Sequence, residues 1–230
     1  TLQSVNPKYI LELTATPKRN SNIISFIDAI RLKKENMVKL PVIVYNQNSI
    51  NDVINGAINL QRSLEVKAKE VEANGGDFIR PIVLFQAQPK INEGTETFDK
   101  IKTKLVEIGI PEDQIKIKTA EKDELKNTNL MGRDCEVRYI ITVDALKEGW
   151  DCPFAYILAS LANKTSRISV EQILGRVLRQ PYTRKHSCEF LNLSYVFTCS
   201  ADFQRTLTGI VESLNKSGFS SKDFFAKDNT

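Results

Sequence analysis

The sequence has few of the side chains that bind transition metals or form crosslinks. Its 230 residues include one histidine, His186, and four cysteines, which are Cys135, Cys152, Cys188 and Cys199. None of the cysteines has the close CxxC spacing that is typical of a structural zinc site. We therefore expect no metal site, and we expect the cysteines to be reduced thiols.

Long apolar runs are also lacking. No window is long enough to span a membrane, and there is no basic start followed by an apolar run and a small-residue cleavage site. A hydrophobic share of 41% and a charged share of 26% exclude an intrinsically disordered chain. These observations predict a globular protein of the cytoplasm, long enough for one sizeable domain with attached pieces.

No strong excess of one charge is present. The 32 basic and 28 acidic residues give a net charge of +4, which allows a polyanionic partner without requiring one. Basic residues gather between Lys164 and Lys185, where Glu171 is the only acid. Charge alone favours a solvated basic face for this stretch.

Strand-like and helix-like segments alternate along the chain. Apolar runs rich in β-branched residues predict strands at residues 9–13, 42–45, 82–85, 115–117, 137–142, 155–159 and 190–197. Helical spacing occurs at residues 50–73, 96–108, 122–126, 170–178 and 201–216. The alternation predicts an α/β fold, a parallel sheet with helices on both faces, because parallel neighbours need crossover connections.

One helix-like segment, EQILGRVLR at residues 171–179, has a pattern that suits an anion. Gln172, Gly175, Arg176 and Arg179 fall on one helical face. Two arginines one turn apart repel each other, whereas phosphate matches the guanidinium fork. Taken alone, the segment is more simply an amphipathic helix with two surface arginines.

Two further segments follow predicted strands. In LELTATPKR, Thr14 and Thr16 come at the carboxyl end of a strand, where open α/β sheets bind ligands; the alternative is a serine/threonine-type turn. In ITVDALKEGWDCP, Gly149 allows close approach of a ligand, and the carboxylate of Asp151 can accept from a ribose hydroxyl. Trp150 is more simply a packed residue.

The order of these segments resembles that of motifs III to VI of superfamily 2 helicases. TAT, QAQ, KEGWD and QILGRVLR occur in that order, each of the first three after a predicted strand. LKEGWDCP followed by QILGRVLRQP resembles in particular the Res subunit of type III restriction enzymes. The resemblance covers nearly the whole chain and implies a RecA-like sheet, as in the C-terminal lobe of P-loop NTPase-like helicases.

The resemblance implies roles for individual residues. Gln172, Arg176 and Arg179 would act in catalysis, with the arginines on the γ-phosphate in the transition state. Thr14 and Thr16 would couple the nucleotide state to movement of the lobes.

Two more groups of residues take their roles from the resemblance. The nucleotide cofactor, near its ribose, would be contacted by Glu148, Gly149 and Asp151. The nucleic-acid backbone would be contacted by Gln86, Thr119 and Thr142. Many members of the superfamily have their motif V threonine at the position of Val143, one residue later than Thr142.

The chain departs from a complete motor. It contains no GxxxxGK[ST] loop, and no Asp-Glu pair follows an apolar strand. The resemblance therefore implies that residues 1–45 are the end of a first RecA-like lobe with a linker, residues 46–200 are the second lobe, and residues 201–230 are a C-terminal helical extension. ATP and Mg²⁺ would be held mainly by the first lobe, which would precede Thr1.

The functional expectation is an ATP-dependent DNA translocase, the motor of a type III restriction endonuclease subunit. Its partners would be double-stranded DNA, the first lobe and a DNA methyltransferase subunit, and this chain alone would be inactive. One alternative is a non-catalytic nucleic-acid-binding module, against which the joint presence of both arginines and KEGWD argues. The other alternative is a superfamily 2 helicase outside restriction.

Overall fold

The computed structural model describes residues 8–11, 22–25, 29–88, 97–143, 151–161, 177–199, 208, 220 and 223–228. Within these residues seven strands form one sheet in the order β3-β4-β2-β5-β6-β1-β7. The strands are β1 (Val42–Asn46), β2 (Ile82–Gln86), β3 (Ile115–Lys118), β4 (Tyr139–Thr142), β5 (Ala155–Ser160), β6 (Ser194–Thr198) and β7 (Phe224–Asp228). All neighbouring strands are parallel. The predicted fold is confirmed in its α/β class and in its parallel sheet.

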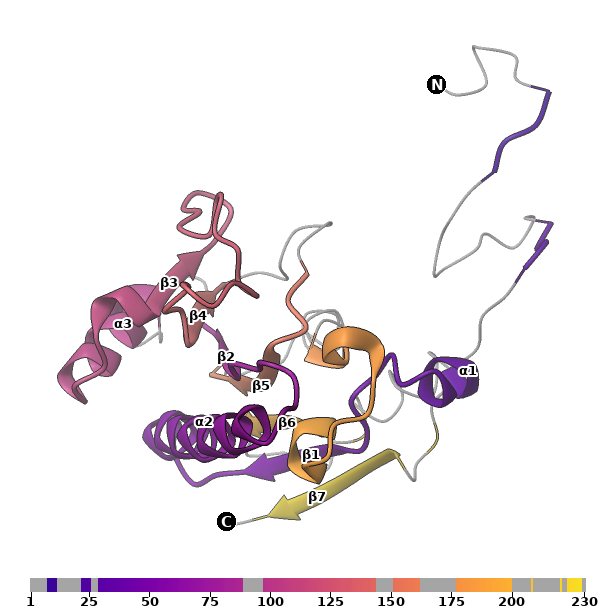
Figure 1. The fold of residues 1–230 in the computed structure, drawn as a ribbon. Helices are drawn as coiled ribbons and strands as arrows, with labels where there is room; N and C mark the ends of the chain where they lie inside the picture. Colours follow the sequence, from indigo (N-terminus) through magenta and orange to yellow (C-terminus); the bar gives the residue numbers. More distant parts are fainter. Residues whose placement is uncertain are drawn as a thin grey trace.

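Two helices lie on one face of the sheet. Helix α2 (Ile50–Ala73) connects β1 to β2, and α3 (Phe98–Glu107) lies between β2 and β3. Both connections cross the sheet in the same direction, so right-handed crossovers place both helices on the same side. Figure 1 shows α2 and α3 together there, with the short helix α1 (Ala29–Lys34) on the other side.

The ends of α2 match its sequence signals. The Oγ atom of Ser49 accepts a hydrogen bond from the amide of Asp52 at 3.1 Å, which satisfies one of the unpaired donors of the first turn. After Asn74 the chain turns at Gly75, whose φ of 83° suits glycine. The predicted range of 50–73 is confirmed, and α3 lies within its predicted range of 96–108.

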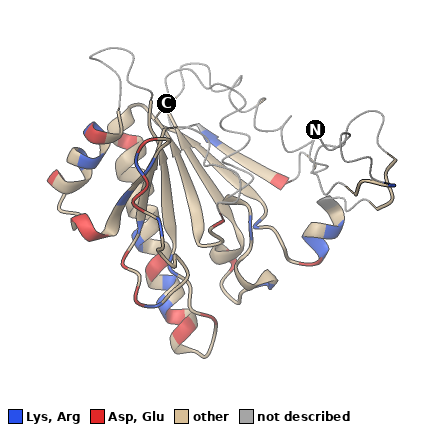
Figure 2. Cartoon of the chain, turned by 90° about the horizontal axis from the view of Figure 1, so that it is seen from above, with Lys and Arg blue, Asp and Glu red and all other residues tan. Residues whose placement is uncertain are grey.

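The middle of the sheet is buried on both sides. Every residue of β2, β4, β5 and β6 is buried, as expected for parallel strands covered on both faces. Figure 2 shows charged residues along the helices, while the central strands carry almost none. The second face is covered in part by the connection from β3 to β4, where Leu125, Leu130 and Val137 are buried.

Three predicted elements differ from the structure. Residues 9–11, predicted as part of a strand, form none, because they pair with no other segment in the described part of the chain. Residues 122–126 form a turn instead of a helix: Asp123 bridges to Lys118, and the amide of Glu124 donates to the carbonyl of Ile117. Contacts with the strand replace the bonds that so short a helix would make.

The third difference concerns the predicted strand at 190–197. Residues Glu189–Asn192 form a 3-10 turn, η4, and β6 begins only at Ser194. The side-chain amide of Asn192 donates to the carbonyls of His186 and Cys188. This side chain closes the turn, and the chain becomes extended only after it. The strand predicted from the apolar run therefore began too early.

The sheet contains residues from all three predicted parts of the chain. Strand β1 crosses the predicted boundary at residue 45, and it pairs with β6 and β7. Strand β7 lies in the stretch 201–230, where a helical extension was predicted, and it adds to the same sheet. The division into three parts stays a prediction, but residues 42–46 and 224–228 pack with the central lobe.

Candidate functional site

Two residues from separate motifs meet as an ion pair. Nη1 of Arg179, from QILGRVLR, lies 2.5 Å from Oδ2 of Asp151, from KEGWD. Both side chains are about half exposed, 53% for Arg179 and 46% for Asp151. The sequence assigned Arg179 to a phosphate and Asp151 to a ribose, so the structure places two predicted nucleotide contacts side by side on the surface.

The backbone of Arg179 is held firmly although its side chain is exposed. Val38 and Arg179 form an antiparallel bridge. On either side of it, the amide of Lys39 donates to the carbonyl of Leu178 at 2.6 Å, and the amide of Gln180 donates to the carbonyl of Met37 at 3.0 Å. This short ladder fixes the point from which the guanidinium extends.

The neighbours of Asp151 are anchored in the core. Cys152 and Phe154 are fully buried, and the carbonyl of Phe154 accepts from the amide of Ile82 at 2.8 Å. Burial raises the pKa of the Cys152 thiol to about 12, which keeps the thiol neutral. Asp151 is therefore an exposed carboxylate on a rigid base.

The Lys39 side chain bonds both to the segment that carries Asp151 and to the segment that carries Arg179. Its ammonium nitrogen donates to the carbonyl of Pro153 at 3.0 Å and to the carbonyl of Arg179, and it lies 4.5 Å from the ring centre of Tyr156. The side chain is fully buried. Burial lowers the pKa of Lys39 to about 7, although Cys152 and Asp151 act in the opposite direction.

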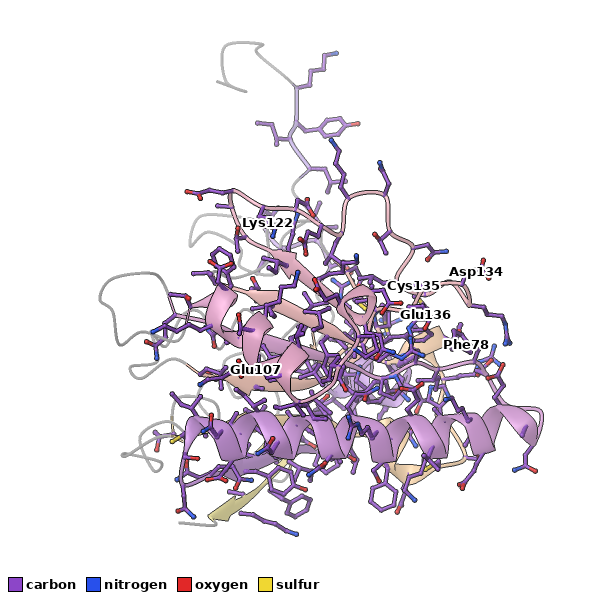
Figure 3. The ribbon with its side chains drawn as sticks, turned by 90° about the vertical axis from the view of Figure 1, so that its left-hand side faces the viewer. Phe78, Glu107, Lys122, Asp134, Cys135 and Glu136 are labelled. Atoms are coloured by element: carbon purple, nitrogen blue, oxygen red, sulfur yellow. The ribbon has the colours of Figure 1, made fainter. Side chains whose placement is uncertain are left out.

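The loop after Arg179 is tied to the end of the sheet where the strands begin. The Tyr182 hydroxyl donates to the carbonyl of Phe78 at 2.7 Å, and the Tyr182 and Phe154 rings pack edge to face. Figure 3 shows Phe78 beside Glu136 and Cys135, near the C-terminal end of α2. Tyr182 and Thr183 have φ values of 58° and 47°, unusual for residues with a Cβ atom.

The predicted nucleic-acid contacts lie at the carboxyl ends of three strands. Gln86 and Thr142 are register partners at the carboxyl ends of β2 and β4, and Thr119 follows the last residue of β3. Gln86 and Thr142 are buried, with exposed fractions of 3% and 1%, and the Oε1 atom of Gln86 accepts from Ser160. Thr119 is the one of the three that is partly exposed.

Six predicted site residues lie outside the described residues: Thr14, Thr16, Glu148, Gly149, Gln172 and Arg176. Their predicted roles stay predictions. The structure thus brings together Arg179 and Asp151, and it brings Gln86 and Thr142 together at the carboxyl ends of β2 and β4. Asp151 also lines a pocket with Lys118, the residue before Thr119.

Metal ligands do not gather in the part of the chain that the structure describes. No group of three or more His, Cys, Asp or Glu side chains is placed there to hold an ion. All four cysteines are free thiols. No helix among the described residues is long and apolar enough to cross a membrane.

Comparison with protein-family models gives no match, and comparison with curated proteins gives none either.

Among solved structures there are distant similarities. Domain 2 of the DEAD-box helicase Mss116p bound to an RNA duplex has a TM-score of 0.49 at 13% identity, over 83% of this chain and 65% of that chain. The ATP-dependent type ISP restriction-modification enzyme LlaBIII bound to DNA has a TM-score of 0.46 at 12% identity, over 86% of this chain and 16% of that chain.

A further similarity is to a fragment described as the HsdR subunit of a type I restriction enzyme from Vibrio vulnificus. The TM-score is 0.45 at 15% identity, over 86% of this chain and 38% of that chain. The chain therefore spans between 16% and 65% of the length of these three proteins. Similarities this distant assign no function, which has to be argued from the site.

Two buried residues that hold chain segments together were not predicted from the sequence. Lys39 lies in MVKLPVIVY and Arg80 lies in FIRPIVLF, and both side chains are buried. The signal was a single cation inside an apolar run just before a proline. A cation in such a place must find acceptors, because burying it unpaired is costly.

Proposed function

We propose that this chain is the second lobe of an ATP-driven nucleic-acid motor of superfamily 2. The observation that carries the proposal is the ion pair of Arg179 and Asp151, because two residues that separate motifs assign to one nucleotide are in contact. Arg179 would stabilise negative charge on the γ-phosphate as it develops, and Asp151 would accept a hydrogen bond from a ribose hydroxyl.

The ion pair leaves the arginine suited to a phosphate. A guanidinium has five N–H donors in a fixed fork, and the ion pair with Asp151 is made through Nη1. An ion pair between two half-exposed side chains contributes only about 0–1 kcal/mol. A phosphate could therefore replace or share the contact at little cost.

The position of the pair favours a site that a second lobe completes. An open α/β sheet usually binds its own ligand at the carboxyl ends of its strands. Arg179 and Asp151 lie instead near Lys39 and Pro153, before the first residues of β1 and β5. We infer that ATP and Mg²⁺ are held mainly by a first lobe, whose phosphate loop this chain lacks.

The N-terminal stretch is consistent with such a lobe. Tyr9 is 84% exposed, Leu11 is 68% exposed and Ile24 is 83% exposed. Several large apolar side chains left exposed within one stretch favour an interface with another part of the protein. We infer that this stretch packs against the first lobe of the same chain.

The finer assignment is the motor of a type III restriction endonuclease subunit in the cytoplasm. It would move along double-stranded DNA and work with a DNA methyltransferase subunit. The support is the pair of segments LKEGWDCP and QILGRVLRQP, whose residues and order resemble those of the Res subunit.

The deciding experiment measures ATP hydrolysis by the two-lobed protein with Arg179 replaced. Arg179→Ala should lower kcat by about 10³-fold while KM changes less than about tenfold, because the contact acts mainly in the transition state. Arg179→Lys should not restore kcat, since an ammonium lacks the planar fork.

Arg133→Ala is the matched control. Arg133 is also an exposed arginine paired with a carboxylate, that of Glu72, but it belongs to none of the motifs. This variant should retain its kcat. Unchanged kcat in both Arg179 variants would contradict the proposed function.

A further inference from the structure

The segment that carries Lys39 contacts both halves of the candidate site. It lies between α1 and β1, far in sequence from either motif. Its backbone pairs with residues 178–180 through the two amide bonds that flank the Val38 to Arg179 bridge. Its lysine side chain reaches the carbonyls of Arg179 and Pro153.

We propose that Lys39 is a positioning residue that holds Arg179 and Asp151 in register for the same ligand. The proposal rests on the proposed function of Arg179. Lys39 would touch no nucleotide itself, since its side chain is fully buried. It would act by tying together the two backbone points from which the functional side chains extend.

The choice of acceptors supports a positioning role. A buried ammonium costs several kcal/mol unless other contacts offset this cost. In the described part of the chain Lys39 forms no salt bridge with a carboxylate, and its hydrogen bonds go to two main-chain carbonyls. A lysine that only balanced charge would pair with an acid, whereas bonds to two carbonyls fix the spacing of two chain segments.

The bonds survive a change of protonation state. An ammonium has three N–H donors and a neutral amine has two, so either form can donate to both carbonyls. The Tyr156 ring, 4.5 Å away, adds a favourable contact for the charged form. The contact of Lys39 with both segments therefore persists near neutral pH.

The geometry also connects the preceding chain to the arginine. Any displacement of residues 37–39 moves Val38, the bridge partner of Arg179, because Met37 and Lys39 on either side of it are bonded to Gln180 and Leu178. In the proposed motor these residues follow the first lobe. The position of Arg179 would then depend on where that lobe lies.

The test is a double-mutant cycle on ATP hydrolysis by the two-lobed protein. Lys39→Met keeps the aliphatic part of the side chain and removes its donors. It should lower kcat about 10- to 100-fold, since a misplacement of about 1 Å costs on that order, and KM should change less than about threefold. In the presence of Arg179→Ala, Lys39→Met should cause no further loss, because both act through the same group.

Lys67→Met is the matched control. Lys67 also lies over an aromatic ring, that of Phe190 at 4.7 Å, but it contacts neither Arg179 nor Pro153. The Lys67→Met variant should have an unchanged kcat. Lys39→Gln, which retains an N–H donor, should fall between Lys39→Met and the unmodified protein.

The outcomes separate the two proposals. If Arg179→Ala leaves kcat unchanged, the proposed function fails, whatever Lys39 does. If Arg179→Ala lowers kcat and Lys39→Met has no effect, or an effect that adds fully to that of Arg179→Ala, the positioning role is overturned.

A readout without activity checks the same geometry. The amides of Gln180 and Lys39 should exchange with solvent faster in Lys39→Met, because both belong to the ladder beside Arg179. The amide of Ile101 in α3, which donates to Thr97, should be unaffected. Equal exchange at Gln180 in both proteins would show that Lys39 does not hold this segment.

Discussion

Arg138 donates to both carboxylate oxygens of Glu65. The distances are 3.3 Å from Nε to Oε2 and 3.1 Å from Nη2 to Oε1. The fork links α2 to the residue directly before β4, and the two side chains are 16% and 15% exposed. Bidentate pairs of this kind are stronger and more directional than single contacts.

We predict that Glu65→Gln lowers the free energy of unfolding by about 1–3 kcal/mol at neutral pH, as expected for losing hydrogen bonds to a charged group. Burial raises the pKa of Glu65, but hydrogen bonds from Arg138 and Gln61 outweigh burial and lower it to about 2. The stabilisation is thus present above the unfolded-state pKa, near 4.5, and lost as pH falls toward about 2. Urea denaturation at several pH values measures it.

Glu70→Gln, at an exposed position of α2, is the control. It should change stability by less than about 0.5 kcal/mol. A Glu65→Gln variant as stable as the unmodified chain at pH 7 would contradict the prediction.

Arg80→Met should destabilise the chain by about 2–4 kcal/mol, because buried carbonyls would lose a charged donor. The Arg80 guanidinium donates to the carbonyls of Val137, Gly132 and Leu130, and so holds the connection into β4. Arg133→Met is matched, since Arg133 also lies over the Phe78 ring but is exposed. It should cost less than about 1 kcal/mol, and a larger loss of stability for Arg133→Met than for Arg80→Met would contradict the prediction.

Lys39 should make the stability depend on pH just above neutrality. Its folded-state pKa is lowered to about 7 from 10.5 by burial, against the opposing effects of Cys152 and Asp151. Above pH 7 the unfolded chain binds a proton that the folded chain does not, so stability rises with pH, by at most about 1.4 kcal/mol per unit.

The rise of stability with pH ends at higher pH. The pKa of Cys152 is raised from 9.0 to about 12 by burial, so above pH 9 the unfolded chain loses a proton that the folded chain keeps. This opposes the effect of Lys39. Thermal unfolding between pH 7 and about 8.5 should therefore show a rising stability that Lys39→Met removes, and equal slopes for both proteins would argue against a buried, titrating Lys39.

The isolated 230-residue chain should hydrolyse no ATP, because it lacks a loop of backbone amides for the triphosphate. Its binding to DNA should be weak, insensitive to sequence and strongly dependent on salt, since a single lobe offers few phosphate contacts. Steady ATP turnover abolished by Arg179→Ala, or tight binding to one sequence at high salt, would contradict these expectations.

Periodicity located most of the secondary structure. Residues 50–73 form α2 as predicted, because Ser49 and Gly75 mark both ends and the apolar stripe is continuous. The buried strands were found for a similar reason, since β2 is an unbroken apolar run. The turn at 122–126 was missed because its bonds go to β3, which local sequence does not reveal.

Only the two charged side chains of the candidate site could be predicted from the sequence. Asp151 and Arg179 stand in motifs, so a pattern could name them, and the structure adds that they touch. The support beneath them was not visible, because Lys39 acts on main-chain carbonyls whose position depends on the tertiary fold. Gln86 and Thr142 were placed correctly at strand ends, but their burial also depends on neighbouring strands.

The pairing of β1 has a consequence for how the chain folds. In the described sheet its neighbours are β6 and β7, which come from residues 194–198 and 224–228. Because synthesis proceeds from the N-terminus, β1 leaves the ribosome long before either neighbour exists. Strands β2 to β5 can associate first, while the largely apolar residues 42–46 remain unpaired. Such distant pairing slows folding, and it leaves this early strand edge exposed in the nascent chain, where a chaperone can bind it.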